Sequence, residues 1–158
     1  MSDPERTGPH ALPVERYEWA ATKVADLLVA DAACGLGYGA AILDKQASCA
    51  IGFDASAEAI VPTIPFVHCN VEAQTFRGFD AVVCLEALSH FIDPLSWMKG
   101  LDVPVVVLSM PIVPSMAVYP WRKHEFTVEQ FENMIEPKWT IRDRLQQKRY
   151  LTIYAEAP

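Results

Sequence analysis

The stretch LLVADAACGLGYGAAILDK, residues 27–45, decides the fold of this chain. It begins as a short apolar run, turns through Gly35, Gly37 and Gly39, and resumes as a helix-like apolar segment. This order predicts a strand, a glycine-rich loop and a helix. Glycine there lets the backbone approach a ligand closely and adopt positive φ, and the free N–H groups of the helix start face that ligand. The loop is therefore the first candidate binding site.

Two carboxylates accompany the loop. Asp31 ends the first predicted strand, and Asp54 ends a second buried strand, ASCAIGFD, residues 47–54. Asp54 follows the first glycine at the spacing of about 20 residues at which a doubly wound sheet places an acidic side chain on ribose hydroxyls. A tight turn with a capping Asp is the structural alternative, and the strand, loop, helix and strand in register favour a nucleotide-type ligand.

Two kinds of cofactor fit this spacing. Gly35, Gly37 and Ala40 satisfy the dinucleotide pattern G-x-G-x-x-G/A. A nicotinamide enzyme would then need a substrate domain, for which 158 residues leave no room. Asp31 would lie beside a positive or hydrogen-bond-donating end of the ligand, which suits an amino group or a sulfonium better than a pyrophosphate.

The rest of the chain extends the same sheet. Near-continuous apolar strands are predicted at 65–70, 79–86 and 103–111, which is typical of a parallel sheet covered on both faces. The alternating segments 138–145 and 149–157 predict an antiparallel hairpin at one edge. Helices are predicted from about residue 13 to 25 and, with Thr127 as N-cap and Pro137 as the stop, in 127–137. We expect an α/β fold: a doubly wound, mostly parallel seven-stranded sheet with an antiparallel last strand.

Composition bounds the function classes. The length predicts one domain at 14–158 preceded by a flexible arm at 1–13, and 51% hydrophobic residues suffice for a real core. A net charge of −7 argues against general nucleic-acid binding. The apolar runs stop well short of the roughly 20 residues of a membrane helix. The first residues lack a secretory pattern, so we expect a cytoplasmic location. The four cysteines form no C-x-x-C pair, which argues against a zinc site.

Four segments follow one another along the chain: ADAACGLGYGAAIL (30–43), GFDASAEAI (52–60), FDAVVCLEALSHFIDP (79–94) and HEFTVEQF (124–131). In this order they resemble the motifs of class I S-adenosylmethionine-dependent methyltransferases, and the resemblance runs from about Arg16 to the C-terminus. Ala33 stands where the family usually has Gly, which is a mild departure. The resemblance implies the Rossmann-like methyltransferase fold, with S-adenosyl-L-methionine as cofactor and a small-molecule acceptor.

The resemblance also implies roles for individual residues at the cofactor. The glycine loop would pack against the methionine part, Asp31 would face its amino group, and Asp54 would hold the ribose hydroxyls. Asn70 stands where the family often has an Asp that binds the adenine amine, and it keeps an acceptor oxygen. The residues implied at the cofactor are Arg16, Tyr17, Asp31, Ala33, Gly35, Gly37, Gly39, Asp54, Ala55, Asn70, Val71 and Leu85.

Methyl transfer is an in-line displacement, so positioning supplies most of the acceleration, and a base is needed only if the acceptor must lose a proton. The catalytic candidates are His90, His124 and Glu86. The four-residue spacing predicts that Glu86 and His90 share one helical face. His90 fits a packed histidine equally well, and His124 fits a packed aromatic loop equally well. Glu86 and His90 could mimic a two-ligand metal set, but no third ligand accompanies them, so no metal is expected.

The sequence departs from the family after the second strand. Only ten residues separate Asp54 from Pro65, whereas a parallel crossover usually takes a dozen or more and a helix. We predict a shortened crossover with one helical turn around Ser56 to Ile60 and extended chain through Pro62. The apolar face left uncovered should be covered by the N-terminal segment, a partner subunit or both, and we favour a homodimer. This trimming keeps a second hypothesis open, a non-catalytic S-adenosylmethionine-binding or regulatory subunit. An NAD-type oxidoreductase ranks third.

Overall fold

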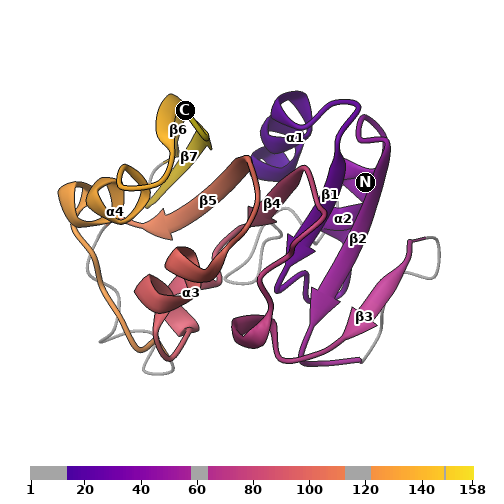
Figure 1. Cartoon of the computed structure of the whole chain (residues 1–158), viewed down its shortest axis with the longest axis horizontal. Coiled ribbons are helices and arrows are strands. Elements are labelled where there is room, and N and C mark those ends of the chain that lie inside the picture. Colours follow the sequence, from indigo (N-terminus) through magenta and orange to yellow (C-terminus); the bar gives the residue numbers. More distant parts are fainter. Residues whose placement is uncertain (1–13, 58–63, 113–121, 148) are drawn as a thin grey trace, which may run out of the picture.

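A computed structural model describes residues 14–57, 64–112, 122–147 and 149–158, so the arm predicted at 1–13 lies outside the described residues. The described chain forms one seven-stranded sheet in the order β3-β2-β1-β4-β5-β7-β6 (Figure 1). The strands are β1 Leu28–Ala32, β2 Cys49–Asp54, β3 Phe66–His68, β4 Ala81–Cys84, β5 Val105–Pro111, β6 Thr140–Gln147 and β7 Tyr150–Glu156. The helices are α1 Val14–Lys23, α2 Tyr38–Leu43, α3 Pro94–Gly100 and α4 Val128–Ile135, with short 3-10 helices η2 Val71–Ala73 and η3 Leu88–His90.

The pairing of the strands confirms the predicted fold class. β1 pairs in parallel with β2 and β4, β2 with β3, and β4 with β5. The last strand, β7, runs antiparallel between β5 and β6. The hairpin predicted at one edge is therefore present, and β6 is the outer strand of the pair.

The central strands are apolar throughout because helices cover both faces of the sheet. In β4, Ala81 and Val83 face the cluster formed with α1 and α2, whereas Val82 and Cys84 face the cluster formed with α3 and α4 (Figure 1). All four are fully buried. The near-continuous apolar run thus reflects burial on two sides rather than an amphipathic strand.

The start of α4 follows the predicted capping. The Thr127 hydroxyl accepts a hydrogen bond from the Gln130 amide at 3.1 Å, and the Gln130 side-chain oxygen accepts from the Thr127 amide at 2.8 Å. This reciprocal capping box satisfies two amides that the helix itself cannot. The helix then buries Phe131 and Ile135 against the sheet.

The predicted helical turn after β2 does not begin where we expected it. Ser56 and Ala57 are not helical, and 58–63, which include the rest of the predicted turn, lie outside the described residues. The amide of Ser56 donates instead to the Asp54 carboxylate at 2.8 Å, which holds the chain in a turn-like bend. On the edge strand β3, Val67 is 41% exposed. The homodimer predicted to cover this side stays a prediction.

The close packing of α1 on α2 explains one of the loop glycines. A Cβ atom at Gly39 would lie 2.1 Å from the Tyr17 ring, far inside contact distance. Tyr17 is 4% exposed and cannot swing into solvent without leaving the core. Gly39 is therefore required by the docking of α1, whereas the sequence had suggested a direct role at the ligand.

We predict that Gly39→Ala lowers the free energy of unfolding by about 1–3 kcal/mol, because overpacking outweighs the gain of about 1 kcal/mol that Ala brings to a helix. Gly100→Ala is the matched control, since a Cβ at Gly100 meets nothing within 4 Å. Urea unfolding of both variants measures the difference. A Gly39→Ala protein as stable as the Gly100→Ala protein would contradict the packing argument.

Candidate functional site

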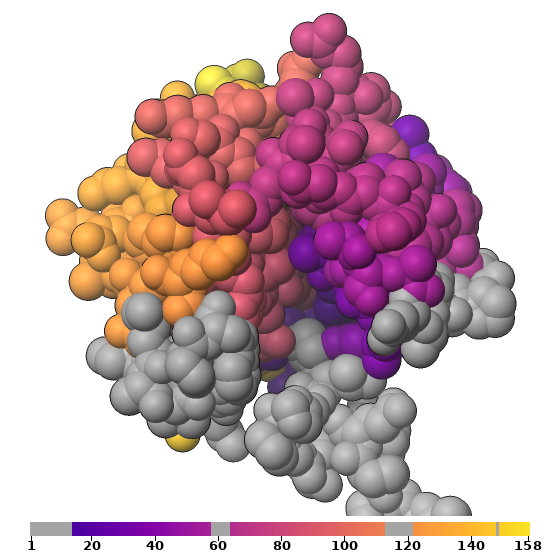
Figure 2. All heavy atoms as spheres, turned by 90° about the horizontal axis from the view of Figure 1, so that it is seen from below, coloured from indigo at the N-terminus to yellow at the C-terminus, as the bar shows by residue number. Residues whose placement is uncertain are grey.

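The carboxyl ends of β1, β2 and β4 meet at one edge of the sheet because these strands are parallel. Seen from that edge, the surface is hollowed between the purple and magenta residues on one side and the pink and orange residues on the other (Figure 2). Open α/β sheets bind ligands in the crevice outside the carboxyl ends of their strands. The residues around this hollow are therefore the candidate site.

The loop between β1 and α2 takes a conformation that its glycines permit. Gly35 and Gly37 have φ of +56° and +83°, and Gly37 is the N-cap of α2. Ala33 has φ of 62°, so a residue with a side chain occupies a left-handed position where Gly would carry no strain. The departure noted at Ala33 thus carries a conformational cost.

Asp54 joins this loop to the end of β2. Its two carboxylate oxygens accept from the amides of Gly35 and Ser56, each at 2.8 Å. A carboxylate offers about four acceptor positions, so these bonds leave it able to accept from further hydroxyl groups. Asp54 is half-buried, which keeps it accessible from the hollow.

Asp31 is fully buried at the end of β1. One of its oxygens accepts a hydrogen bond from the Tyr17 hydroxyl at 3.1 Å, and the other has no partner among the described residues. Burial raises the pKa of Asp31 to about 8 although the Tyr17 bond acts in the opposite direction, and the nearby Asp54 charge raises it further. Burial and the Asp31 charge likewise hold the pKa of Tyr17 well above its usual value. The open Asp31 oxygen can receive a donor or a cation from a ligand, since none of the described residues supplies one there.

A charged cluster lies beside this pair. Arg16 of α1 forms an ion pair with Glu86, and its guanidinium carbon lies 4.3 Å from the centre of the Tyr150 ring. Arg122 donates to the Tyr150 hydroxyl at 2.9 Å. Burial raises the pKa of Glu86, although the Arg16 and Arg122 guanidiniums oppose that shift.

The helical face predicted for Glu86 and His90 is wrong. Glu86 has φ of 62°, outside any helix, and its amide donates to the Ser109 hydroxyl of β5 at 2.8 Å. His90 lies in η3 and is half-buried. Glu86 instead pairs with Arg16, which lies 70 positions away in the sequence, and a sequence period cannot show such a long-range pair.

His124 serves as a hydrogen-bond donor in this structure. Its Nε2 lies 3.0 Å from the Phe91 carbonyl oxygen and 3.2 Å from that of Ile92. Carbonyl oxygens only accept, so Nε2 carries the hydrogen. The ring also stacks on Phe126, with 5.6 Å between the ring centres. His124 thus holds a neighbouring turn rather than presenting Nε2 as a base.

The residues expected at the adenine end lie together. The amide of Cys69 donates to the Asp54 carbonyl, and His68 Nε2 lies 2.8 Å from the carbonyl oxygen of Ala55. Asn70 follows directly, and its side-chain oxygen accepts from the Glu72 amide at 3.1 Å. Val71 and Leu85 are both buried, at 5% exposure, but Leu85 packs in the cluster under α1.

Sequence reasoning missed three residues of the charged cluster, Ser109, Arg122 and Tyr150. Tyr150 reaches the site because β7 pairs antiparallel with β5, which places Tyr150 opposite Pro111 at the carboxyl end of β5. Only the strand register reveals that position, so no local motif could have identified it. A buried Ser in an otherwise apolar strand was the one signal available for Ser109.

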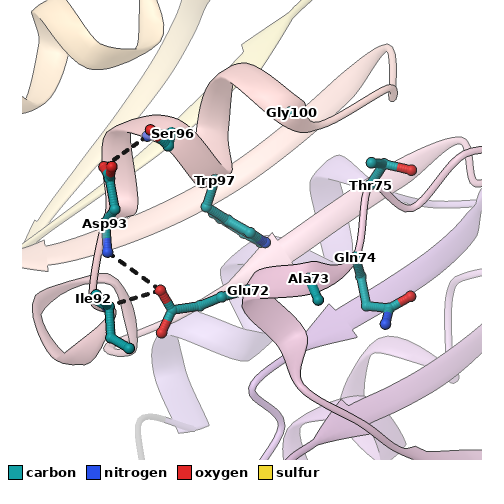
Figure 3. A pocket seen from close by; sticks show the side chains of 9 residues that line it. All are labelled: Glu72, Ala73, Gln74, Thr75, Ile92, Asp93, Ser96, Trp97 and Gly100. Carbon is teal, nitrogen blue, oxygen red and sulfur yellow. Dashed lines mark hydrogen bonds between the residues drawn. The ribbon is translucent and has the colours of Figure 1, made fainter.

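A separate cavity of about 340 Å³ lies between η2 and α3 (Figure 3). None of the loop or carboxylate residues described above lines it, so we place the chemistry at the hollow instead. The residues that line this separate cavity are Glu72, Ala73, Gln74, Thr75, Ile92, Asp93, Ser96, Trp97 and Gly100. Within the part of the chain that the structure describes, no group of three or more His, Cys, Asp or Glu side chains could hold a metal ion. No described helix is long and apolar enough to cross a membrane.

Comparison with known proteins finds one family model that matches part of the chain. Residues 30–102 match the family described as "Methyltransferase domain". No curated protein sequence matches the chain significantly.

Solved methyltransferases share the fold across most of the chain. An S-adenosylmethionine-dependent methyltransferase from Mesorhizobium loti superposes with a TM-score of 0.70 at 17% identity, covering 89% of this chain and 97% of that one. Magnesium protoporphyrin IX methyltransferase from Synechocystis PCC 6803, solved with bound S-adenosylhomocysteine, gives 0.73 at 18% identity over 92% of this chain and 82% of that one. A putative methyltransferase from Bacillus halodurans gives 0.74 at 13% identity over 92% and 99%.

The burial of Asp31 has a measurable consequence for stability. With a folded pKa of about 8 and an ordinary value of 3.8, the folded protein keeps a proton between about pH 4 and pH 8 that the unfolded chain has released. The free energy of unfolding should therefore fall as pH rises through this window, by up to about 1.4 kcal/mol per pH unit. Asp31→Asn keeps an acceptor for Tyr17 and removes this slope.

Urea unfolding of the wild type and Asp31→Asn between pH 5 and pH 8 tests this expectation. The free energy of unfolding of the variant, relative to that of the wild type, should increase with each step to higher pH. Parallel stability curves would show that Asp31 ionises in the fold as it does in the unfolded chain.

Proposed function

We propose that this chain belongs to the class I S-adenosylmethionine-dependent methyltransferases, binds S-adenosyl-L-methionine at the hollow and transfers its methyl group to a small-molecule acceptor; the match of residues 30–102 to a methyltransferase domain supports this. The observation that carries the proposal is the buried Asp31 carboxyl group, which has one oxygen without a partner among the described residues and lies directly before the glycine loop. A buried polar atom without a partner is costly, and a ligand amino group would supply the missing donor.

The amino-acid end of the cofactor fits between α1 and β1. Its ammonium group would bind the Asp31 oxygen that Tyr17 leaves open, and this opposite charge would favour the ionised carboxylate. The Arg16 Nε atom is buried and has no partner among the described residues, so it can donate to the cofactor carboxylate. A zwitterion would thus satisfy two buried polar atoms at once.

The nucleoside end fits along the ends of β2 and β3. Asp54 already accepts from two backbone amides and keeps free acceptor positions for the ribose hydroxyls. Ala55 and Val71 would border the adenine, and the Asn70 oxygen, which accepts from one amide, can accept from the adenine amine as well. Gly35 and Gly37 let the loop backbone approach the ligand between the two ends.

When bound, the cofactor supplies an activated methyl group, so the chain has to orient two molecules and exclude water. Glu86 is held by Arg16 and serves as a positioning residue, since its carboxylate anchors α1 over the site. His90 lies in η3 after Glu86. We propose that it is the base nearest to the acceptor and that it takes up the proton if the acceptor must lose one. The 122–126 segment would close the acceptor side.

One observation favours the alternative of a non-catalytic cofactor-binding subunit. Glu86 is ion-paired and His124 Nε2 is bonded to carbonyl oxygens, so two of the three predicted catalytic groups are engaged. Incubation with S-adenosylmethionine and a panel of small phenols, amines, thiols and carboxylic acids separates the two hypotheses. Formation of S-adenosylhomocysteine that depends on an acceptor supports transfer. Tight cofactor binding without turnover across the panel would favour the subunit, and NAD serves as the comparison ligand in the binding assay.

We predict that Asp54→Ala weakens S-adenosylmethionine binding at least about tenfold, because hydrogen bonds to an ionised carboxylate contribute roughly 1.5–3 kcal/mol each. Asp54→Asn keeps one acceptor oxygen and should lose less. Asp102→Ala is the matched control, since that carboxylate lies in an exposed ion pair with Arg77. Isothermal titration calorimetry gives the three affinities. Equal affinities for the folded Asp54→Ala and Asp102→Ala proteins would remove Asp54 from the site.

A further inference from the structure

The turn Phe91–Asp93, called here the 91–93 turn, connects η3 to α3, and its last two residues are held by polar contacts. The Ile92 side chain is 74% exposed, so its burial contributes little to the position of the turn. Asp93 caps α3 by accepting from the Ser96 amide at 2.9 Å. Phe91 is anchored in the core, where its ring packs on that of Trp97, so the hydrogen bonds of the backbone act mainly on Ile92 and Asp93.

Two side chains from different segments form hydrogen bonds to that backbone, one to its amides and the other to its carbonyl oxygens. The Glu72 carboxylate accepts from the amides of Ile92 and Asp93 at 2.8 and 3.3 Å, both at the same oxygen (Figure 3). His124 Nε2 donates to the carbonyl oxygens of Phe91 and Ile92. Ile92 is thus bonded through its amide to one side chain and through its carbonyl to the other.

Glu72 is also part of the turn that we assign to the adenine. Its amide donates to the Asn70 side chain at 3.1 Å, and it follows Val71 directly. The Val71 carbonyl in turn accepts from the Trp97 indole of α3 at 3.0 Å. The adenine end of the site is therefore connected directly to the 91–93 turn through the Glu72 carboxylate, whereas Trp97 joins η2 to α3.

The carbonyl side of the 91–93 turn is bonded to the 122–126 segment, which we place at the acceptor end of the site. The 122–126 segment docks on η3, because the amides of Lys123 and His124 both donate to the Ser89 carbonyl at 2.8 and 3.2 Å. His124 then reaches from this segment to the 91–93 turn. A displacement of the turn would move His124 and the backbone that follows η3 together.

We propose that Glu72 is a positioning residue that couples cofactor binding to the acceptor side of the site. The coupling rests on the proposed function, since it requires the cofactor's adenine to lie at Asn70 and Val71. A ligand that orders these two residues also fixes Glu72, which lies next to them. Glu72 then holds the 91–93 turn, through bonds that an ionised carboxylate makes stronger than a neutral acceptor would. Because His124 is bonded to the carbonyl oxygens of this turn, the 122–126 segment is restrained together with it.

Three variants test whether the Glu72 carboxylate oxygen carries the coupling. Glu72→Ala removes the acceptor, whereas Glu72→Gln keeps one oxygen, and one oxygen makes both bonds to the turn. Thr75→Ala is the matched control because Thr75 lines the same cavity and contacts Asp102 through its backbone carbonyl. Thermal unfolding first establishes that all three variants are folded.

The experiment measures hydrogen exchange of the Ile92 and Asp93 amides by NMR with and without saturating S-adenosylhomocysteine. In the wild type, Thr75→Ala and Glu72→Gln, the ligand should slow exchange at both amides at least about fivefold, the lower end of a typical coupling between sites. In Glu72→Ala the ligand should still bind but change the exchange of the turn less than twofold.

Two results would overturn the coupling while leaving the proposed function intact. One is binding of S-adenosylhomocysteine to the wild type with no change in exchange at Ile92 and Asp93. The other is ligand-dependent slowing in Glu72→Ala equal to that in Thr75→Ala. Failure of the wild type to bind S-adenosylhomocysteine in calorimetry would instead overturn the proposed function, and the coupling with it.

Discussion

The buried carboxyl group of Asp31 is the constraint from which the arrangement of the site follows. A carboxyl group without solvent contact must find hydrogen-bond partners, and the one that the described residues supply is the Tyr17 hydroxyl, bonded to one of its oxygens. That bond fixes the first half of α1, which packs on one face of the sheet, against the end of β1. It also requires Gly39, because the Tyr17 ring occupies the place where a Cβ at Gly39 would lie. The bond between Tyr17 and Asp31 thus determines where a helix and a loop must meet.

The same docking of α1 organises the charged cluster on its other side. Arg16 lies beside Tyr17 in α1, so the placement of one brings the other to Glu86 and to the ring of Tyr150. The backbone of Glu86 has a left-handed conformation, which is uncommon for a residue with a side chain. Its amide is satisfied by Ser109 of β5. The strain at Glu86 is tolerated because an ion pair and a hydrogen bond both fix it, as is common near functional sites.

The parts of the molecule that could be predicted are those encoded by neighbouring residues. The strand, loop and helix of 27–45 and the capping box at Thr127 depend on contacts within a few residues, and the structure has both. The pair of Arg16 and Glu86 joins residues 70 positions apart, and no period or motif encodes it. The shared helical face for Glu86 and His90 was wrong for this reason. Tyr150 similarly needed the register of β7 against β5, which sequence alternation leaves open.

A crystal structure of the protein with S-adenosylhomocysteine tests the account of the site most directly. We expect the ligand's amino group within hydrogen-bond distance of the Asp31 oxygen that Tyr17 does not use, and its ribose hydroxyls on the Asp54 carboxylate. Tyr17 should keep its bond to Asp31. A ligand seated in the cavity beside Trp97, or one bound at the hollow with the second Asp31 oxygen still without a partner, would contradict the central claim.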